Sequence, residues 1–124
     1  MAQSTPVWME APEEHDFPAA LDYLTLIMSD KQAAAAVEAL RRAPLIHRKA
    51  KDLLRASRLP LLPRDNAHVA ADLNKVSGGK RLSPVLLLRG RDAIPMTVAD
   101  GYHRVCASYH LDENTDIPCR LVDG

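Results

Sequence analysis

The sequence predicts an α+β fold in which a helical arm precedes a small mixed sheet with helices. Apolar residues recur at helical spacing through the first part of the chain. From Ser57 onward, short apolar runs and helical segments alternate between proline and glycine breaks. Apolar residues make up 47% of the 124 residues, enough for a packed core. We therefore expect a flexible tail over 1–15, a helical arm over 16–56 and an α+β domain over 57–124.

The arm is predicted to contain three helices. Asp16 is a helix-capping residue that precedes leucines at helical spacing. Ser29 and Gln32 have the spacing of a capping box for a second helix, which Pro44 ends. Pro44 would also be tolerated in the first turn of a third helix. That helix would have one apolar face, formed by Ile46, Ala50, Leu53 and Leu54.

The second part is predicted to follow the order strand, helix, strand, strand, helix, strand. The prolines keep 59–63 extended, and Asp65 or Asn66 caps a helix that ends at Gly78-Gly79. The continuous apolar run of Val85–Leu88 is typical of a strand buried on both faces. The remaining expected elements are a strand over Met96–Ala99, a helix over Tyr102–Leu111 and a strand over Ile117–Leu121. Pro118 favours an edge position for this last strand.

The charges cancel overall but are segregated along the chain. Residues 1–40 hold seven acidic residues and one basic residue, residues 41–58 hold seven basic and one acidic, and the rest is balanced. Zero net charge argues against a strongly basic nucleic-acid binder. We expect the two charged segments to face each other, within one chain or across a homodimer formed through the N-terminal helices. DNA contact by the basic segment is less favoured, because no aromatic residue interleaves it.

The sequence also predicts a cytoplasmic protein without a membrane partner. The N-terminus has no basic segment followed by an apolar one, and no apolar run approaches the roughly 20 residues of a membrane span. Two cysteines are too few for a disulfide scaffold. Zinc at Cys106, His110 and Cys119 is disfavoured, because a fourth ligand is not evident.

The segment Asp100-Gly101-Tyr102-His103-Arg104 is the sharpest candidate site. It lies where a predicted strand leads into a helix, and the free N–H groups of a helix start favour anions. Arg104 is a bidentate donor suited to phosphate, and His103 adds a donor that titrates near neutral pH. Asp100 is a candidate Mg²⁺ ligand or base. The alternative is that Asp100 only caps the helix while His103 and Arg104 are solvated.

Further segments of residues 57–124 carry a family resemblance around this motif. They are Leu61-Leu62-Pro63, Lys80 to Leu87, Ala99 to Ala107 and Ile117 to Val122. Taken in this order, residues 57–124 resemble the ParB/sulfiredoxin superfamily domain. The resemblance implies a compact α+β fold with a nucleotide or phosphate at the start of the Gly-x-His-Arg helix. It implies bound ATP, ADP or CTP with Mg²⁺, and places Lys80 and Ser83 beside the nucleotide.

The family's motifs differ among its members. Sulfiredoxins have a catalytic cysteine where this chain has Tyr102, so sulfinic-acid reduction is not expected. Partition proteins, which bind and hydrolyse CTP, have Gly-Glu-Arg-Arg at this place. The Asp-Gly-His-His-Arg motif of the free serine kinases is the most similar and differs only at Tyr102. Those kinases also use a carboxylate base outside the motif, for which Asp65 and Asp72 are the candidates here.

The function expected from these features is binding of a nucleotide or phosphometabolite. If the protein is an enzyme, the resemblance implies a Mg²⁺-dependent small-molecule kinase or a nucleotide hydrolase, with Asp100 and His103 as catalytic residues. Gly101, Tyr102, His103 and Arg104 would bind the cofactor, together with Lys80 and Ser83. The alternative is a non-enzymatic DNA-associated or regulatory module.

Overall fold

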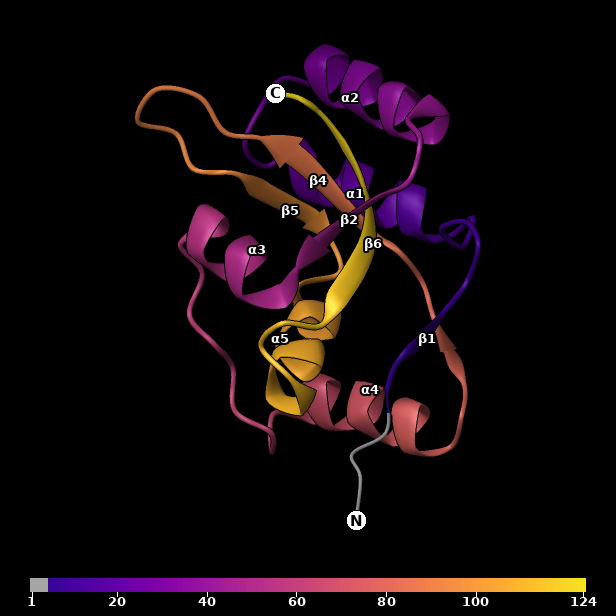
Figure 1. Cartoon of the computed structure of the whole chain (residues 1–124). Coiled ribbons are helices and arrows are strands. Elements are labelled where there is room, and N and C mark those ends of the chain that lie inside the picture. The colour runs from indigo at the N-terminus through magenta and orange to yellow at the C-terminus, as the bar shows by residue number, and fades with distance from the viewer. Residues whose placement is uncertain (1–4) are drawn as a thin grey trace.

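The computed structural model describes residues 5–124 and shows the predicted α+β class (Figure 1). The helices are α1 (Asp16–Leu24), α2 (Asp30–Arg42), α3 (Ala50–Ser57), α4 (Ala67–Ser77) and α5 (Tyr102–Leu111). The strands are β1 (Val7–Trp8), β2 (Ile46–Lys49), β3 (Arg81–Leu82), β4 (Val85–Arg89), β5 (Thr97–Asp100) and β6 (Asp116–Asp123).

The central sheet is mixed and has the strand order β2-β6-β4-β5. Strand β4 runs parallel to β6, with Val85 opposite Cys119, and antiparallel to β5. Strand β2 is antiparallel to β6, with Ile46 opposite Cys119. A separate parallel pair joins β1 to β3. The sheet therefore combines strands from the predicted arm and from the predicted domain.

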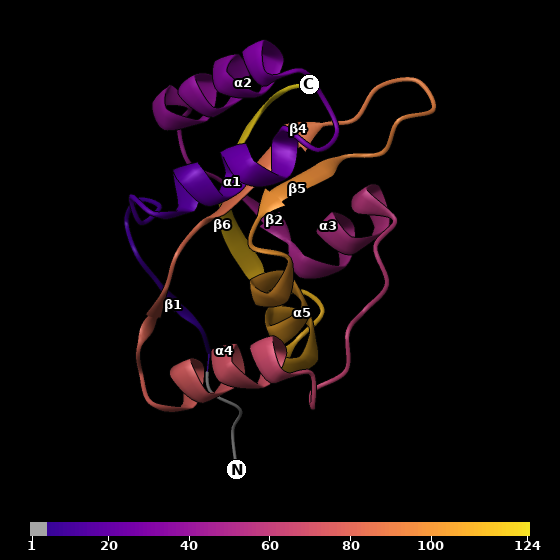
Figure 2. The same ribbon diagram turned by 180° about the vertical axis from the view of Figure 1, so that it is seen from behind.

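Helices cover both faces of this sheet (Figures 1 and 2). On β4, Leu86 and Leu88 belong to a core cluster with α1 and α2, whereas Val85 and Leu87 belong to a second cluster with α3, α4 and α5. Successive strand residues point to opposite faces, so one continuous apolar run supplies both cores. The predicted strand over Val85–Leu88, buried on both faces, is confirmed.

Several local signals form the elements that were predicted from them. Ser29 and Gln32 make the reciprocal hydrogen bonds of a capping box at the start of α2. Asn66 accepts from the backbone N–H groups of His68 and Val69 at the start of α4. Helix α5 has the predicted bounds. These signals work because they satisfy backbone groups within a few residues of themselves.

The predicted third helix of the arm is wrong at its beginning. Residues 46–49 form strand β2, and α3 starts only at Ala50. Strand β2 makes β6 an inner strand, so the edge position predicted from Pro118 is also wrong. Pro118 lies opposite His47 in this pairing. The short segment 46–49 takes its conformation from a partner strand that is distant in sequence.

The N-terminal boundaries also differ from the prediction. Residues 1–4 of the predicted flexible tail lie outside the described residues. Val7–Trp8 pairs with Arg81–Leu82, so the described part of that segment is joined to the fold. Asp16 is not the cap of α1 but its first residue, and its side chain is buried. The helical arm shares its sheet and its core with the predicted domain.

Candidate functional site

The candidate motif lies where β5 turns into α5. Gly101 has φ +113°, a left-handed backbone conformation that disfavours other residues. A Cβ atom at this position would lie 2.9 Å from Val85 Cγ2 and 3.0 Å from Arg104 Nη2. Within residues 5–124 no side chain caps α5. The turn therefore brings Arg104 against the backbone and leaves an uncapped helix start.

One side of Arg104 is a closed polar network. Arg104 Nη2 lies 2.9 Å from Asp100 Oδ2, 3.7 Å from Asp16 Oδ2 and 3.3 Å from the carbonyl of Pro84. Ser83 Oγ donates to Asp16 Oδ2 and accepts from the N–H of Glu13 at 3.0 Å. The side chains of Arg104, Asp100 and Asp16 are 16%, 19% and 5% exposed. Because both carboxylates contact one guanidinium in a largely buried place, this side fixes the arginine.

The other side of Arg104 is an open polar hollow of about 260 Å³ between α4 and α5. It is lined by His68, Ala71, Asp72, Lys75, Asp100, Gly101, His103 and Arg104. The imidazole rings of His68 and His103 lie 4.7 Å apart, centre to centre. Lys75 Nζ is 4.0 Å from Asp72 Oδ1. The hollow thus places two carboxylates, two imidazoles and two cations around one space.

Burial shifts the titration of the groups around the hollow. Desolvation raises the pKa of Asp72 and of Asp100, although Arg104 opposes both shifts. Desolvation and the neighbouring His68 lower the pKa of His103, which opposes its protonation. The lowered pKa favours the neutral form of His103, which has a ring nitrogen that can accept a proton.

The predicted site residues do not all face the hollow. Asp100, Gly101, His103 and Arg104 line it, whereas the hydroxyl of Tyr102 donates to the carbonyl of Pro60. Ser83 belongs to the closed network. Lys80 is exposed and is not among the lining residues. Neither Ser83 nor Tyr102 therefore presents its hydroxyl to the hollow.

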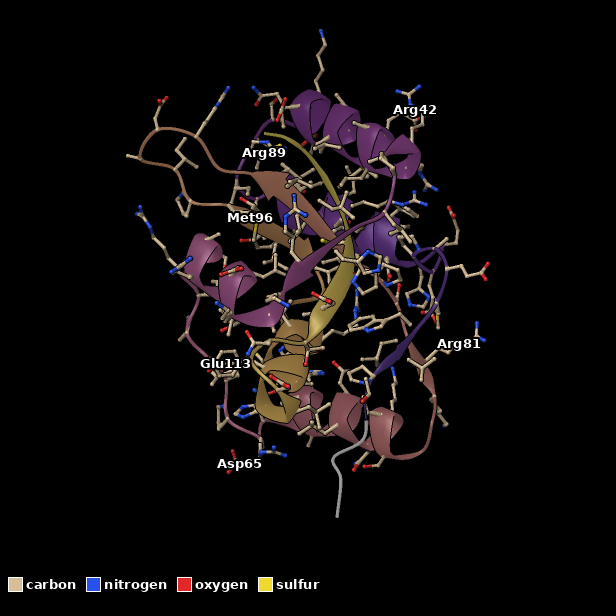
Figure 3. All side chains as sticks on the ribbon, in the orientation of Figure 1. Arg42, Asp65, Arg81, Arg89, Met96 and Glu113 are labelled. Carbon is tan, nitrogen blue, oxygen red and sulfur yellow. The ribbon has the colours of Figure 1, made fainter. Side chains whose placement is uncertain are left out.

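Of the two candidate carboxylate bases, Asp72 lines the hollow. Asp65 is exposed before α4, and Figure 3 shows it at the lower edge of the molecule. His68 and Lys75 were not predicted as site residues. With Asp72 they follow the spacing i, i+4, i+7, which puts them on one face of α4 beside its apolar stripe. That polar stripe was the signal available in the sequence.

The cysteines have structural environments. Cys106 and Cys119 are buried and unbonded to each other, and burial raises the pKa of the Cys119 thiol to about 11. His110 Nε2 donates to the carbonyl of Leu62 at 2.7 Å. Among the described residues, the one group of three close metal-type ligands is Glu13, His15 and Asp16. The disfavoured zinc set therefore does not gather at one point.

The two charged segments contact each other only in part. Arg41 pairs with Glu14 at 2.6 Å and Arg42 with Glu38 at 3.9 Å, and Figure 3 shows Arg42 on α2 at the top of the molecule. The other basic residues that form ion pairs have Asp52 or Asp116 as partners; they are Lys49, Lys51 and Arg55. Within this chain, Arg41 and Arg42 thus pair with acids of the N-terminal segment, whereas contact of the remaining basic residues with that segment across a homodimer stays a prediction.

A larger and more apolar groove, of about 730 Å³, lies away from the motif. It runs between α2 and the β4–β5 hairpin, and its lining includes Ile27, Ala35, Ala36 and Ile94. It carries no counterpart of the histidine and carboxylate set around Arg104. The homodimer expected through the N-terminal helices stays a prediction.

Two further findings concern the helices and the similarity of this chain to other proteins. Among residues 5–124, none of the helices has the length and apolar character that a membrane crossing requires. The chain matches no protein-family model, no curated protein and no solved structure.

Proposed function

We propose that the hollow at the start of α5 binds the phosphate groups of a nucleotide or phosphometabolite together with Mg²⁺. The main observation behind this proposal is that the uncapped start of α5 lies beside Lys75, His103 and Arg104, which line the same hollow. Helix starts and cations both favour anions. Arg104 is restrained by Asp100 and Asp16, so its charge is held at the hollow before a ligand arrives.

The carboxylates that line the hollow are suitable ligands for a Mg²⁺ ion bound together with the phosphate compound. Asp72 and Asp100 supply hard oxygen atoms, and protein-bound Mg²⁺ commonly uses one or two carboxylates plus phosphate oxygens. When bound, Mg²⁺ would neutralise phosphate charge beside these two acids. Without a cation, two carboxylates in the lining would repel a phosphate.

The same residues support phosphoryl transfer to a small hydroxyl compound or to water. The attacking oxygen forms a bond to phosphorus, the bond from phosphorus to the bridging oxygen breaks, and the leaving phosphate retains that electron pair. His103 accepts the proton of the attacking hydroxyl, because it lines the hollow and its lowered pKa favours the neutral imidazole. Lys75 and Arg104 hold the phosphate oxygens, so catalysis is mainly positioning and charge neutralisation.

Calorimetric titration of ATP, ADP and CTP with and without Mg²⁺ tests the binding proposal. We expect binding that needs Mg²⁺ and that weakens about tenfold or more in Lys75→Ala or His103→Ala, the usual effect of losing a contact to a charged group. Lys31→Ala, an exposed lysine on α2, is the matched control and should bind like the wild type. A folded wild-type protein that binds no nucleotide at millimolar concentration would overturn the proposal.

The basic segment gives less support to a DNA-associated or regulatory module. Five of its seven cations already form ion pairs with carboxylates of this chain. Arg48 and Arg58 are the two without such a partner among residues 5–124. Two unpaired arginines would neutralise few phosphates, so we expect weak and strongly salt-dependent DNA binding at most.

A further inference from the structure

We infer that the hollow recognises the phosphate end of its ligand alone and does not select a nucleobase. The ligand class is a compound with a terminal diphosphate or triphosphate group, and inorganic pyrophosphate and tripolyphosphate belong to it. This inference rests on the proposed function, because it specifies which part of the ligand the same site recognises. It differs from the expected ATP, ADP or CTP specificity, in which the base would be recognised.

The first support is the chemistry of the lining. Ala71 supplies the one apolar side chain among the eight lining residues, and the rest are charged side chains, imidazoles and a glycine. Sites that hold a nucleobase or similar ring are lined mainly by apolar and aromatic groups, with a few polar groups for orientation. A base placed in this hollow would lose water without gaining an apolar contact. A phosphate group finds cations, donors and Mg²⁺ ligands there.

The second support is the state of the nearby aromatic side chains. The hydroxyl of Tyr102 donates to the carbonyl of Pro60, and its ring lies 5.6 Å from that of His103, centre to centre. Trp8 packs against the core cluster of α3, α4 and α5 and lines a different hollow with Leu111. The rings of His68 and His103 lie close to each other, at 4.7 Å. Among residues 5–124, the rings that line the hollow are therefore these two imidazoles, which lie against each other, and neither Tyr102 nor Trp8 adds a stacking surface there.

The third support is size. The hollow measures about 260 Å³, which is below the roughly 300–1,000 Å³ of pockets that enclose drug-sized ligands. Lys75 and Arg104, the two cations, line this small hollow. A diphosphate would place its oxygens among them, whereas an attached nucleoside would extend into solvent. Its base would then contribute little binding free energy.

Calorimetry in excess Mg²⁺ with ADP, CDP, inorganic pyrophosphate and adenosine tests the inference. We expect the dissociation constants of ADP, CDP and pyrophosphate to agree within about threefold, and adenosine not to bind. Lys75→Ala should weaken all three phosphate ligands by the same factor, while Lys31→Ala changes none of them. Equal losses would show that the three ligands share one phosphate site.

The outcomes separate this inference from the proposed function. If ADP binds but CDP or pyrophosphate binds more than tenfold more weakly, the inference is overturned and the nucleotide site stands. Binding of adenosine alone would also overturn it. If no phosphate compound binds to the folded protein, both the proposed function and this inference are wrong.

Discussion

The polar groups on the two sides of Arg104 differ in burial and in their hydrogen bonding. On one side, Asp16, Ser83 and Asp100 are largely buried and bonded to one another or to the guanidinium. On the other side, the polar groups of α4 and α5 surround a hollow open to solvent. One arginine therefore links a closed structural network to an open site.

This difference shows how a small domain can hold a charged group ready for a ligand. The closed side restrains the guanidinium through contacts that are present without any ligand. The open side places Lys75, Asp72 and the two imidazoles around a space that a ligand can enter. Losses on the closed side should therefore lower stability, and losses on the open side should lower binding. Four substitutions test this division, in order of decreasing effect on stability.

Asp16→Ala should be the most destabilising. It removes a carboxylate from a buried network, leaves the Ser83 hydroxyl without its acceptor and leaves Arg104 with Asp100 as its remaining carboxylate partner. Leaving a buried donor without its acceptor costs about 1–3 kcal/mol, and more where a charged group is involved. Urea denaturation measures the free energy of unfolding, and Asp22→Ala, exposed on the same helix, should stay within about 0.5 kcal/mol of wild type. A loss of stability below about 1 kcal/mol in Asp16→Ala would show that the closed network contributes little to the folded state, contrary to this division.

Gly101→Ala should cost about 1–3 kcal/mol, because φ +113° strains any other residue there. The new Cβ would also press on Val85 and on the Arg104 guanidinium, so both sides of the arginine are affected. Gly78→Ala is the matched control, since φ there is −84° and the nearest atom to a new Cβ lies at 3.4 Å. Thermal or urea unfolding compares the two. Equal stability of both variants would contradict the tight turn.

Tyr102→Phe should cost about 1 kcal/mol, the usual contribution of one hydrogen bond. It removes the bond to Pro60 but no group that lines the hollow. Phosphate affinity should therefore be unchanged in calorimetry. Tyr23→Phe, exposed on α1, serves as the control for loss of a phenol hydroxyl. A tenfold loss of affinity in Tyr102→Phe would place this residue on the open side instead.

Asp72→Asn should have the smallest effect, and the size of this effect should depend on pH. Burial raises the pKa of this carboxyl above the ordinary 3.8, so its ionised form is less favourable in the folded than in the unfolded chain. This destabilisation is absent below 3.8 and is fully present once the pH exceeds the folded pKa. The variant should therefore gain stability relative to wild type as the pH rises from 3 to 7. Urea midpoints across this range measure it.

The exposed Asp65 provides the control for replacement of a carboxylate on the same side of the molecule. Asp65→Asn changes a side chain that is not buried and should leave the free energy of unfolding within about 0.5 kcal/mol of wild type. An Asp72→Asn variant that becomes less stable than wild type as the pH rises would show that Lys75 and Arg104 outweigh desolvation at Asp72.

Prediction from sequence succeeded where an element carries its own signal. The capping box of Ser29 and Gln32, the apolar run of β4 and the glycine between β5 and α5 are all read from neighbouring residues. It failed at residues 46–49, which have no alternating apolar pattern and become a strand by pairing with β6. The same failure put β6 at the edge of the sheet.

The candidate site, like the fold, could be predicted from the sequence only in part. The sequence by itself determined Asp100 to Arg104 as a strand-to-helix motif, because backbone geometry and helix-start chemistry are local. Only the tertiary structure decided that Asp16 meets Arg104 from one side and that α4 brings His68, Asp72 and Lys75 to the other. These neighbours come together because α1 packs on one face of the sheet while α4 and α5 pack on the other, and no local signal specifies which side chains that packing brings together.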